Sequence, residues 1–569
     1  MKSTVWPGLL ALLCGATFIF ARLGHLPLMQ PDEGRNAEVA REMQDSGAWL
    51  VPTYNGLPYL DKPSFYFKTI ALSFALFGET ATAARLSSAL FGLALLAMTF
   101  AFCRHEYGDR AAALAIVVVA TAPLYLAFSR LVIFDMTLTF FVCGAIFAGY
   151  FAEQNQSRTR ARWYLLGSAS AAVATLVKGP IGFILPTLVL AIFNLLNKNR
   201  AALKHFFAPL NLVVFFAITL PWFLGVNHLH PDFAYYGIIE ESFHRFTTTQ
   251  FRRTGPVYYY VPWIAGGLFP WSVLLPEAVG AAWRARKRWT SADRLFMVWT
   301  VAVVAFFSIS KSKRPDYILS VVVALGALTG RMFASALEDR NGLAARVVRH
   351  SAVMLAALGV IGAGCLAVLA IHPHMIEKPL KVDAGELGRV AALCARLSTG
   401  LLLAVVAAGI ARRRADARAV FAAFVLFPLV LLTVGFDGIR LYANAKSSRA
   451  LTDQLPELPA RTELACLECF PTGLPFYRKQ LVTVLTKDGG ELTSNYIEFM
   501  LKKTKPWPPG VVPLEERDRW LASRDHPVLL LARRNAVDVL QSIAVSRSAP
   551  VTDFGMGWWG ALLPWPGGS

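Results

Sequence analysis

Long apolar runs separated by short polar stretches dominate the pattern along the 569 residues. About thirteen of these runs approach the roughly 20 residues that an α-helix needs to cross a bilayer. They lie near residues 5–22, 84–103, 111–128, 134–152, 163–178, 179–197, 206–227, 257–282, 294–310, 316–335, 351–372, 389–411 and 418–435. The pattern therefore predicts a polytopic α-helical membrane protein with about 13 transmembrane helices.

Two apolar stretches need a separate interpretation. Residues 63–78 are short and contain Lys68, and a span there would invert every later loop, so we interpret this stretch as interfacial. The first run, after Lys2, has the outline of a signal peptide but no small-residue cleavage site follows it. We expect it to be retained as the first helix.

Composition and charge support a membrane protein and give its orientation. The chain is 55% hydrophobic and only 16% charged, with a formal net charge of +19. If the N-terminus is inside, basic clusters such as residues 158–162, 284–288 and 412–414 all lie on cytoplasmic loops, as the positive-inside rule requires. Most of the positive charge therefore reflects topology, and nucleic-acid binding loses its support.

Three large segments fall on the outer side: residues 23–83, residues 228–256 and the tail from 436 to 569. The tail has no spanning run and alternates short apolar strands near 463–470, 480–486 and 527–531 with helix-like stretches at 514–523 and 536–543. We predict a transmembrane domain over 1–435 and a soluble α/β domain over 436–569.

The first outer loop carries an acidic pair. Asp32 and Glu33 follow Pro31 directly, which is typical of a helix start, and Arg35 is close enough to orient a carboxylate. Val39, Ala40 and Met43 form an apolar stripe, which suggests an amphipathic helix on the outer leaflet. Capping of the helix is the alternative role for the acidic pair.

Asp135 lies at the predicted outer end of the fourth helix. A carboxylate at membrane depth costs roughly 2.5 to 3.5 kcal/mol on insertion scales, so it is usually paired or functional. The alternative is a simple interfacial pair with Arg130.

A set of cations lies on the outer side against the positive-inside rule, and an anion is needed to explain it. A lipid phosphate would lie at this depth and suits both Arg and Lys. Pairing with Asp316, Glu240 or Glu241 is the alternative for any one of them. The set comprises Lys62, Arg245, Arg252, Arg253, Lys311, Lys313 and Arg314.

Weaker patterns concern metals, thiols and nucleotides. His228 and His230 with Asp232, and His372 with His374, have metal-like spacing, although such histidines are more often ordinary surface residues. The Cys466-Leu467-Glu468-Cys469 sequence favours a structural disulfide or two unpaired thiols over redox catalysis. The chain has no G-x-G-x-x-G or Walker A pattern.

Four motifs together resemble the lipid A aminoarabinose transferases, GT-C enzymes related to the protein O-mannosyltransferases. They are the Pro-Asp-Glu-Gly-Arg-Asn-Ala-Glu loop from residue 31, the segment from Tyr59 to Pro63, Asp135, and the segment from Lys311 to Tyr317. The usual Glu of the family before the Lys is here Asp61. The resemblance implies a GT-C fold with a periplasmic C-terminal domain in the bacterial inner membrane.

The resemblance also implies an activity: inverting transfer of 4-amino-4-deoxy-L-arabinose from undecaprenyl phosphate to a lipid A phosphate, which gives polymyxin resistance. The acceptor phosphate is already an anion, so no base is needed to make the nucleophile. Asp32, Glu33 and Asp135 are then the candidate catalytic residues, and Asp32 is favoured by the resemblance. A divalent metal is possible. The alternatives are another polyprenyl-linked sugar passed to a protein or lipid, and a lipid-phosphate flippase.

The same reading gives the candidate substrate-binding residues and the partners. The residues are Arg35, Tyr59, Asp61, Lys62, Arg245, Arg252, Arg253, Lys311, Lys313, Arg314 and Tyr317. The expected partners are the undecaprenyl phosphate-linked amino sugar, lipid A and the surrounding membrane lipids.

Overall fold

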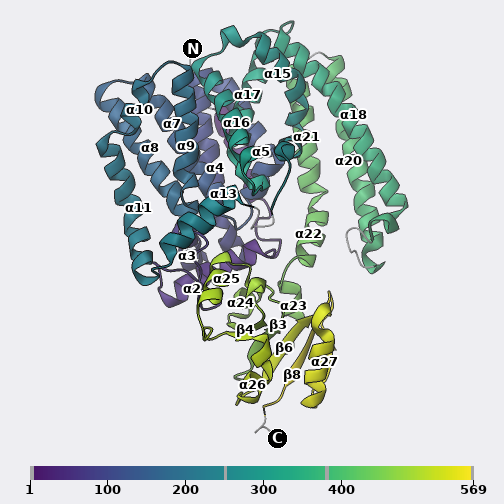
Figure 1. The fold of residues 1–569 in the computed structure, drawn as a ribbon. Coiled ribbons are helices and arrows are strands. Elements are labelled where there is room, and N and C mark those ends of the chain that lie inside the picture. Colours follow the sequence, from purple (N-terminus) through teal and green to yellow (C-terminus); the bar gives the residue numbers. More distant parts are fainter. Residues whose placement is uncertain (1–5, 249–252, 378–383, 415, 566–569) are drawn as a thin grey trace.

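Helices occupy all of the ranges in which the hydrophobic pattern predicts a span. The computed structural model describes residues 6–248, 253–377, 384–414 and 416–565, and Figure 1 shows a helical bundle with a smaller sheet-containing domain at one end. The bundle helices are α1 (Trp6–Phe20), α4 (Ala81–Tyr107), α5 (Asp109–Thr121), α6 (Pro123–Phe128), α7 (Asp135–Gln154), α8 (Ser157–Lys178), α9 (Ile181–Leu196), α10 (Ala201–Phe206), α11 (Pro209–Leu229), α14 (Tyr260–Gly267), α15 (Leu275–Arg284), α16 (Ser291–Ile309), α17 (Leu319–Glu338), α18 (Leu343–Ile371), α20 (Leu387–Arg413) and α21 (Ala417–Thr433).

Not every predicted span is one straight helix. Among the described residues, seven helices are long and apolar enough to cross a membrane, and two bent pairs raise this number to nine if each pair is one span. The prediction of a single helix over 257–282 is wrong, because two pieces meet there at 116°. Gly266, Gly267 and Pro270 lie at the break, and proline removes a backbone donor while glycine weakens a helix.

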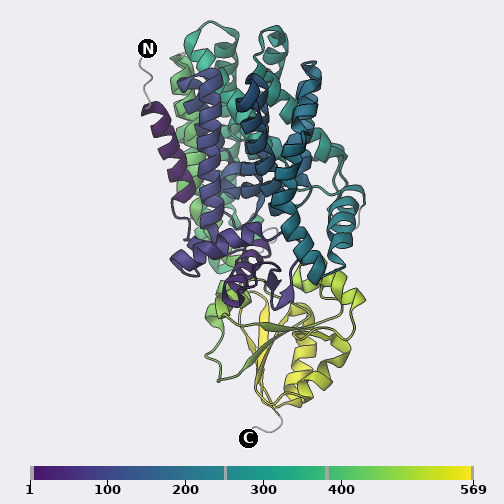
Figure 2. The same cartoon turned by 90° about the vertical axis from the view of Figure 1, so that its left-hand side faces the viewer.

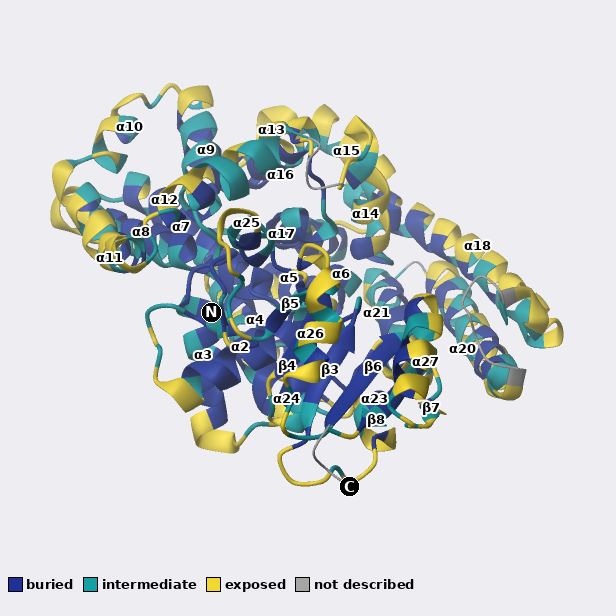
Figure 3. Ribbon diagram, turned by 60° about the horizontal axis from the view of Figure 1, so that its bottom comes forward, coloured by how far each residue is buried: buried dark blue, intermediate teal, exposed yellow. Residues whose placement is uncertain are grey.

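Helices α18 and α20 show the surface expected of a protein in lipid. They pair with each other at the edge of the bundle, and Figure 3 shows much of their length exposed or intermediate. Their exposed residues include Leu358, Ile361, Leu403 and Val406. A continuous apolar face of this kind is expected where acyl chains replace water.

The first outer loop forms α2 (Asp32–Ser46), the two-residue strands β1 (Thr53–Tyr54) and β2 (Leu57–Pro58), and α3 (Phe65–Phe77). The predicted helix start is confirmed, with Pro31 at the N-cap and Gly47 in the left-handed region (φ 67°) ending the helix. The prediction that α2 lies on the outer leaflet is wrong. Residues 33–43 are all buried, because α3 packs on one side and the C-terminal domain covers the other (Figure 2).

The tail forms the expected α/β fold around a six-stranded sheet of order β5-β4-β3-β6-β8-β7, in which β3 to β6 are parallel and β7 and β8 are antiparallel. The position of the domain boundary at 435 stays a prediction. The elements of the tail are α22 (Phe436–Ala445), α23 (Arg449–Gln454), β3 (Glu463–Leu467), α24 (Leu474–Arg478), β4 (Val482–Thr486), α25 (Asn495–Lys503), β5 (Val511–Pro513), α26 (Arg517–Ala522), β6 (Val528–Arg533), α27 (Val537–Ser546), β7 (Val551–Asp553) and β8 (Trp558–Leu563).

The two faces of this sheet have different partners. Ala465 and Leu467 of β3 pack with residues of α26 and α27, whereas Leu464 and Cys466 belong to the same hydrophobic core as the helical bundle. Alternate residues of a strand point to opposite faces, so a single strand can join both cores. The domain is therefore docked on the bundle through one face of its sheet.

Close backbone contacts fix α2 against the docked domain. A Cβ atom on Gly34 would lie 2.7 Å from Cα of Gly473, so only glycine permits this approach. The Thr472 hydroxyl donates to the carbonyl of Pro31 at 3.1 Å, and the Tyr54 hydroxyl donates to the carbonyl of Thr472 at 3.1 Å. These contacts hold the start of α2, where Asp32 lies, in a fixed position.

The second outer segment continues from α11 through α12 (Phe233–Tyr235), the π-helix η1 (Tyr236–His244) and α13 (Arg245–Thr247). π-Helices are rare and occur frequently at functional sites. The Lys-Ser-Lys-Arg segment leads into a short 3-10 helix, η5 (Pro315–Ile318), before α17.

Candidate active site

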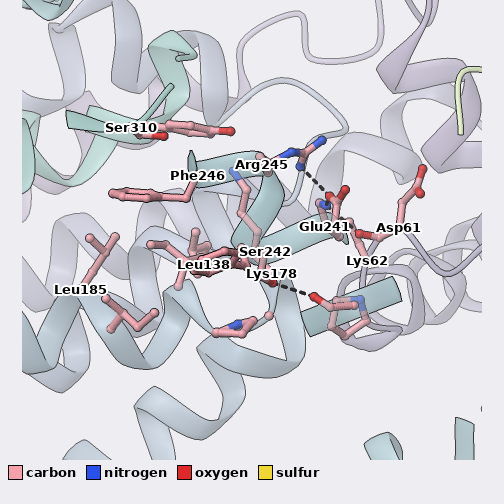
Figure 4. A pocket seen from close by; sticks show the side chains of 18 of the residues that line it. Asp61, Lys62, Leu138, Lys178, Leu185, Glu241, Ser242, Arg245, Phe246 and Ser310 are labelled. Carbon is pink, nitrogen blue, oxygen red and sulfur yellow. Dashed lines mark hydrogen bonds and ion pairs between the residues drawn. The ribbon is translucent and has the colours of Figure 1, made fainter. Parts of the chain in front are cut away.

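A cavity of about 490 Å³ opens at the end of the bundle that contacts the C-terminal domain. Its walls come from the loop before α3, from α7, α8, α9 and α11, from η1 and α13, and from the segment joining α16 to α17. Figure 4 shows Lys62, Glu241 and Arg245 together on one side, with apolar side chains such as Leu138 and Leu185 on the other. The cavity therefore has a charged part and an apolar part.

The first charged group, which we call the cation cluster, consists of Lys62, Arg245 and Glu241. Lys62 Nζ and Arg245 NH1 both donate to Oε1 of Glu241, the second at 2.5 Å. All three side chains are largely buried, with exposed fractions of 10%, 16% and 9%. Two cations share one carboxylate, so these three side chains carry one net positive charge, while the Asp61 carboxylate beside them is engaged in other hydrogen bonds.

Asp61 anchors the cation cluster to the C-terminal domain. Its carboxylate accepts the Tyr236 hydroxyl at 2.6 Å and the backbone N–H groups of Asn495 and Tyr496 at 3.1 and 2.7 Å. The latter two groups begin helix α25, where backbone donors lack helical partners. Asp61 therefore holds the segment of Lys62 and the π-helix η1 against one point of the domain.

The second group, the carboxylate cluster, consists of Asp32, Asp135 and Asp316 with Lys178 and Arg314. Lys178 Nζ donates to Asp135, and to Asp316 at 3.2 Å. The Nε atom of Arg314 donates to Oδ1 of Asp316 at 2.9 Å, and its NH2 atom lies 3.6 Å from Oδ2 of Asp32. Among the described residues, the buried Oδ2 of Asp135 has no hydrogen-bond partner.

Asp32 is the more accessible carboxylate of this cluster, with 28% of its side chain exposed. Arg35 donates to it at 2.5 Å and also donates to the carbonyl and hydroxyl of Thr493 at 2.8 and 2.9 Å. The guanidinium of Arg35 lies 5.7 Å from the ring centroid of the buried Tyr59. The prediction that Arg35 orients a carboxylate is consistent with this geometry.

Glu33 lies in a different environment from its neighbour Asp32. Arg85 donates to both of its oxygens at 2.9 Å, and each side chain of the pair is 2% exposed. The backbone N–H groups of Met29 and Val132 also donate to Glu33, each at 3.0 Å. Neither Glu33 nor Asp32 is among the residues that line the cavity, but Asp32 is partly exposed and Glu33 is not. The oxygens of Glu33 join three segments of the fold.

The alternative in which Asp135 pairs with Arg130 is wrong. Arg130 donates instead to the backbone carbonyls of Phe18, Ile19 and Ala21 at 2.7 to 2.9 Å. Asp135 is the first residue of α7 and so lies at a helix end as expected, and Lys178 is the last residue of α8.

The remaining predicted cations do not share one location. Arg314 joins the carboxylate cluster, and Tyr317 lines the cavity with its ring 5.0 Å from Lys178 Nζ. Lys313 points to the carbonyls of Ser308 and Ser310 at the end of α16, and Lys311 is exposed. The structure therefore does not bring these two lysines into the cavity.

The two arginines before α14 are the last of the set. Arg253 is exposed, and its carbonyl accepts the Lys313 N–H at 2.8 Å; it is not among the residues that line the cavity. Arg252 lies outside the described residues.

Three residues of the cavity were missed as site residues by sequence reasoning. Glu241 and Asp316 were considered only as pairing partners, and Lys178 was not among the candidates. A charged residue in an apolar helix that ends at the outer side is the available signal for Lys178. Glu241 has no distinctive sequence signal, because its role depends on the fold of η1.

Neighbouring cations keep the carboxylates of Asp32 and Glu241 ionised. Burial pushes the pKa of Asp32 up, but Arg35 and Arg314 outweigh it and the pKa lies below its usual range. For Glu241, burial is again outweighed, by Arg245 and Lys62, and the pKa is lowered. Burial lowers the pKa of Lys62, although Glu241 opposes this effect.

The metal and thiol candidates lie elsewhere. Within the described ranges, no group of three or more His, Cys, Asp or Glu side chains is arranged to hold a metal ion. Asp232 accepts the Tyr496 hydroxyl at 3.2 Å, and the rings of His372 and His374 lie 5.7 Å apart. Cys466 and Cys469 are buried free thiols, as one of the two expected alternatives requires. A divalent metal stays a prediction.

Comparison with known proteins adds independent information. Residues 61–224 match the family described as dolichyl-phosphate-mannose-protein mannosyltransferase. The undecaprenyl phosphate-α-4-amino-4-deoxy-L-arabinose arabinosyl transferase of Aeromonas salmonicida is 32% identical over 376 residues, covering 66% of this chain and 67% of the relative. The corresponding transferase 1 of Pseudomonas fluorescens is 30% identical over 389 residues, with coverages of 66% and 67%.

Solved structures extend the similarity to nearly the whole chain. The crystal structure of ArnT from Cupriavidus metallidurans bound to undecaprenyl phosphate has a TM-score of 0.79 and 26% identity, and covers 98% of both chains. The same protein in the apo state gives a TM-score of 0.76, with coverages of 98% and 97%.

Proposed function

Because the chain belongs to the undecaprenyl phosphate-α-4-amino-4-deoxy-L-arabinose arabinosyl transferase family, we propose that its cavity transfers this amino sugar from undecaprenyl phosphate to a phosphate of lipid A. The protein is a glycosyltransferase that uses an undecaprenyl phosphate-linked sugar donor. Transfer to lipid A lowers its negative charge, which would weaken the binding of cationic peptides such as polymyxin.

One observation carries the proposal: charge is separated within a single cavity that also has an apolar part. The donor headgroup contains a negative phosphodiester and a positive ammonium group. The cation cluster suits the first, and the carboxylate cluster suits the second. Leu138, Leu185 and Phe306 provide an apolar wall for the polyprenyl chain.

The reaction balances without a base. The bond from the anomeric carbon to the donor phosphate oxygen breaks, and a bond from the same carbon to an acceptor phosphate oxygen forms. The donor changes from a diester with one negative charge to a monoester with two, and the acceptor makes the opposite change. A single displacement of this kind inverts configuration and needs no net proton transfer.

We assign roles from these charges. Lys62 and Arg245 stabilise the charge that develops on the leaving phosphate oxygen as the glycosidic bond breaks. Asp32, Asp135 and Asp316 face the amino group and the positive charge that builds on the sugar ring. Asp32 is the better catalytic candidate of the acidic pair, since Glu33 is fully engaged with Arg85 and two backbone donors.

The distribution of charge along the chain supports a proposal for its location. We propose that the protein lies in the bacterial inner membrane with the cavity facing the periplasm, the side on which lipid-linked sugars rather than nucleotide sugars are available. A cysteine at the exposed Lys311 should then react with an impermeant reagent in spheroplasts, and one at the exposed Lys287 should not. The reverse pattern would contradict this orientation.

Transfer itself is tested by mass spectrometry. Purified protein in nanodiscs, supplied with the undecaprenyl phosphate-linked amino sugar and lipid A, should add the mass of the amino sugar to lipid A. The Asp32→Asn variant is the matched control. If the mass of lipid A does not change, or if the sugar is found on a protein, lipid A is not the acceptor. The family assignment would remain intact.

A further inference from the structure

Glu241 lies between the two cations that we assign to the donor phosphate. One of its oxygens accepts from both Lys62 and Arg245, and all three side chains line the cavity (Figure 4). A phosphate that binds these cations must compete with this carboxylate for their N–H donors. The Glu241 carboxylate therefore accepts from the same N–H donors that we assign to the donor phosphate.

The second oxygen of Glu241 is held by the C-terminal domain. The side-chain amide of Asn495 donates to Oε2 at 3.3 Å, and the backbone of the same residue donates to Asp61 at 3.1 Å. Asn495 of the C-terminal domain thus holds the Glu241 carboxylate beside Lys62 and Arg245. The position of Glu241 on the π-helix η1, a rare helical form that occurs frequently at functional sites, is compatible with local adjustment.

The charges of substrate and product give this arrangement a purpose. The donor diester carries one negative charge, whereas the product, undecaprenyl phosphate, carries up to two near neutral pH. Two buried cations alone would hold the product more tightly than the donor. They would also be left uncompensated when it departs, which is costly at such low exposure.

We infer that Glu241 is an internal counter-anion that competes with the carrier-lipid phosphate for Lys62 and Arg245, and so promotes release of the product carrier. Asn495 is a positioning residue that holds Glu241 ready for this exchange. The inference rests on the proposed function, because it assumes that the carrier phosphate binds at the cation cluster.

The test compares the affinity for undecaprenyl phosphate in nanodiscs of the wild type, Glu241→Gln and Glu240→Gln. Glu240 is the matched control: it lies in the same segment but pairs with His244 at 3.1 Å and does not line the cavity. We expect Glu241→Gln to bind about tenfold more tightly, since it removes a competing charged contact. Glu240→Gln should bind like the wild type.

Kinetics separates product release from a merely structural role. In Glu241→Gln, a single turnover of bound donor should be retained, while the steady-state rate falls and inhibition by added undecaprenyl phosphate increases. Glu241→Asp, which keeps the charge, should restore much of the wild-type affinity. Equal or weaker carrier affinity in Glu241→Gln, with normal thermal unfolding, would overturn the inference.

Two further outcomes are informative. If Glu241→Gln does not fold, Asn495→Ala replaces it, and binding should tighten by about threefold because Glu241 is less firmly held; unchanged affinity there would overturn the inference. If the wild type binds undecaprenyl phosphate no better than undecaprenol, the proposed function fails first. The two failures are therefore distinguishable.

Discussion

The cation cluster and part of the carboxylate cluster, namely Asp135, Asp316 and Lys178, line one cavity but differ in the sign of their surplus charge. In the first, Lys62 and Arg245 share Glu241. In the second, the carboxylates Asp135 and Asp316 outnumber the cavity-lining cation Lys178. Asp32 lies outside the lining and is paired with Arg35 and Arg314. A cavity built in this way can orient a zwitterionic headgroup, which neither cluster could do alone.

The clusters also differ in how they are built. Asp135 and Lys178 lie at the ends of long bundle helices, which set their positions, whereas Asp32 begins α2, which the C-terminal domain holds in place. Lys62 and Glu241 come from a loop and a π-helix that the C-terminal domain fixes through Asp61 and Asn495. The rigid cluster suits a ring that must be held during chemistry, and the other suits a phosphate that must enter and leave.

The largest effect is expected at the centre of the carboxylate cluster. Lys178→Met would leave Asp135 and Asp316, each 2% exposed, facing each other without their shared cation. Removing one partner of a buried ion pair typically costs about 3 to 5 kcal/mol. Thermal unfolding in detergent should show this loss, together with loss of transfer. A variant with wild-type stability would show that the cluster is better solvated than its burial indicates.

The next effect concerns Asp32. We expect Asp32→Asn to lower the rate of transfer about 10²- to 10³-fold, the usual range for removing one group that stabilises transition-state charge. The affinity for undecaprenyl phosphate should stay within about twofold of the wild type, because Asp32 belongs to the other cluster. Rate and affinity are measured on the same nanodisc preparation. Near-normal turnover would exclude the proposed role.

Glu33→Gln is the contrasting variant at the adjacent position. This change removes the negative charge that pairs with Arg85 but keeps the size of the side chain. The free energy of unfolding should therefore fall, while the rate of transfer per folded molecule is kept. A rate loss as large as that of Asp32→Asn, at unchanged stability, would return Glu33 to the list of catalytic residues.

The sequence predicted most of the helices and three cations of the site, Lys62, Arg245 and Arg314, because both depend on local composition. Apolar runs of the required length must form helices in a bilayer, and charges that break the positive-inside rule stand out along the chain. The strands near 463, 482 and 528 were also predicted, since short apolar runs flanked by turn residues are a local signal.

The pairing within the site could not be predicted in the same way. Lys62 meets Glu241, and Asp61 meets Asn495, across separations of 179 and 434 residues. The burial of α2 on every side depends on a domain more than 400 residues later in the chain, which covers the face expected to contact lipid. The bend between residues 267 and 271 was missed because the prediction used the length of the apolar run and not the helix-breaking residues Gly266, Gly267 and Pro270.

A smaller effect is expected from the cation cluster. Lys62→Ala should weaken undecaprenyl phosphate binding by roughly 1.5 to 3 kcal/mol, the value of a charge-assisted hydrogen bond. Lys62→Arg should restore only part of this, because a planar fork does not replace a point charge. Lys311→Ala, which removes an exposed lysine outside the cavity, is the matched control. Unchanged affinity with lower stability would make Lys62 a structural partner of Glu241 only.

The smallest effect distinguishes titration of the ligand from titration of the protein. The pKa values of Asp32 and Glu241 are lowered by neighbouring cations, so their contribution to stability is present above the unfolded pKa and is lost only as the pH falls through the folded value. Both carboxylates therefore stay ionised between about pH 5.5 and 7.5, whereas a phosphate monoester gains its second charge near pH 6. Affinity for undecaprenyl phosphate should rise across this interval by less than about tenfold, and the slope should be the same in wild type and Glu241→Gln. Titration of binding in nanodiscs at constant ionic strength measures it, and a slope that disappears in Glu241→Gln would mean that Glu241, not the phosphate, changes its charge in this range.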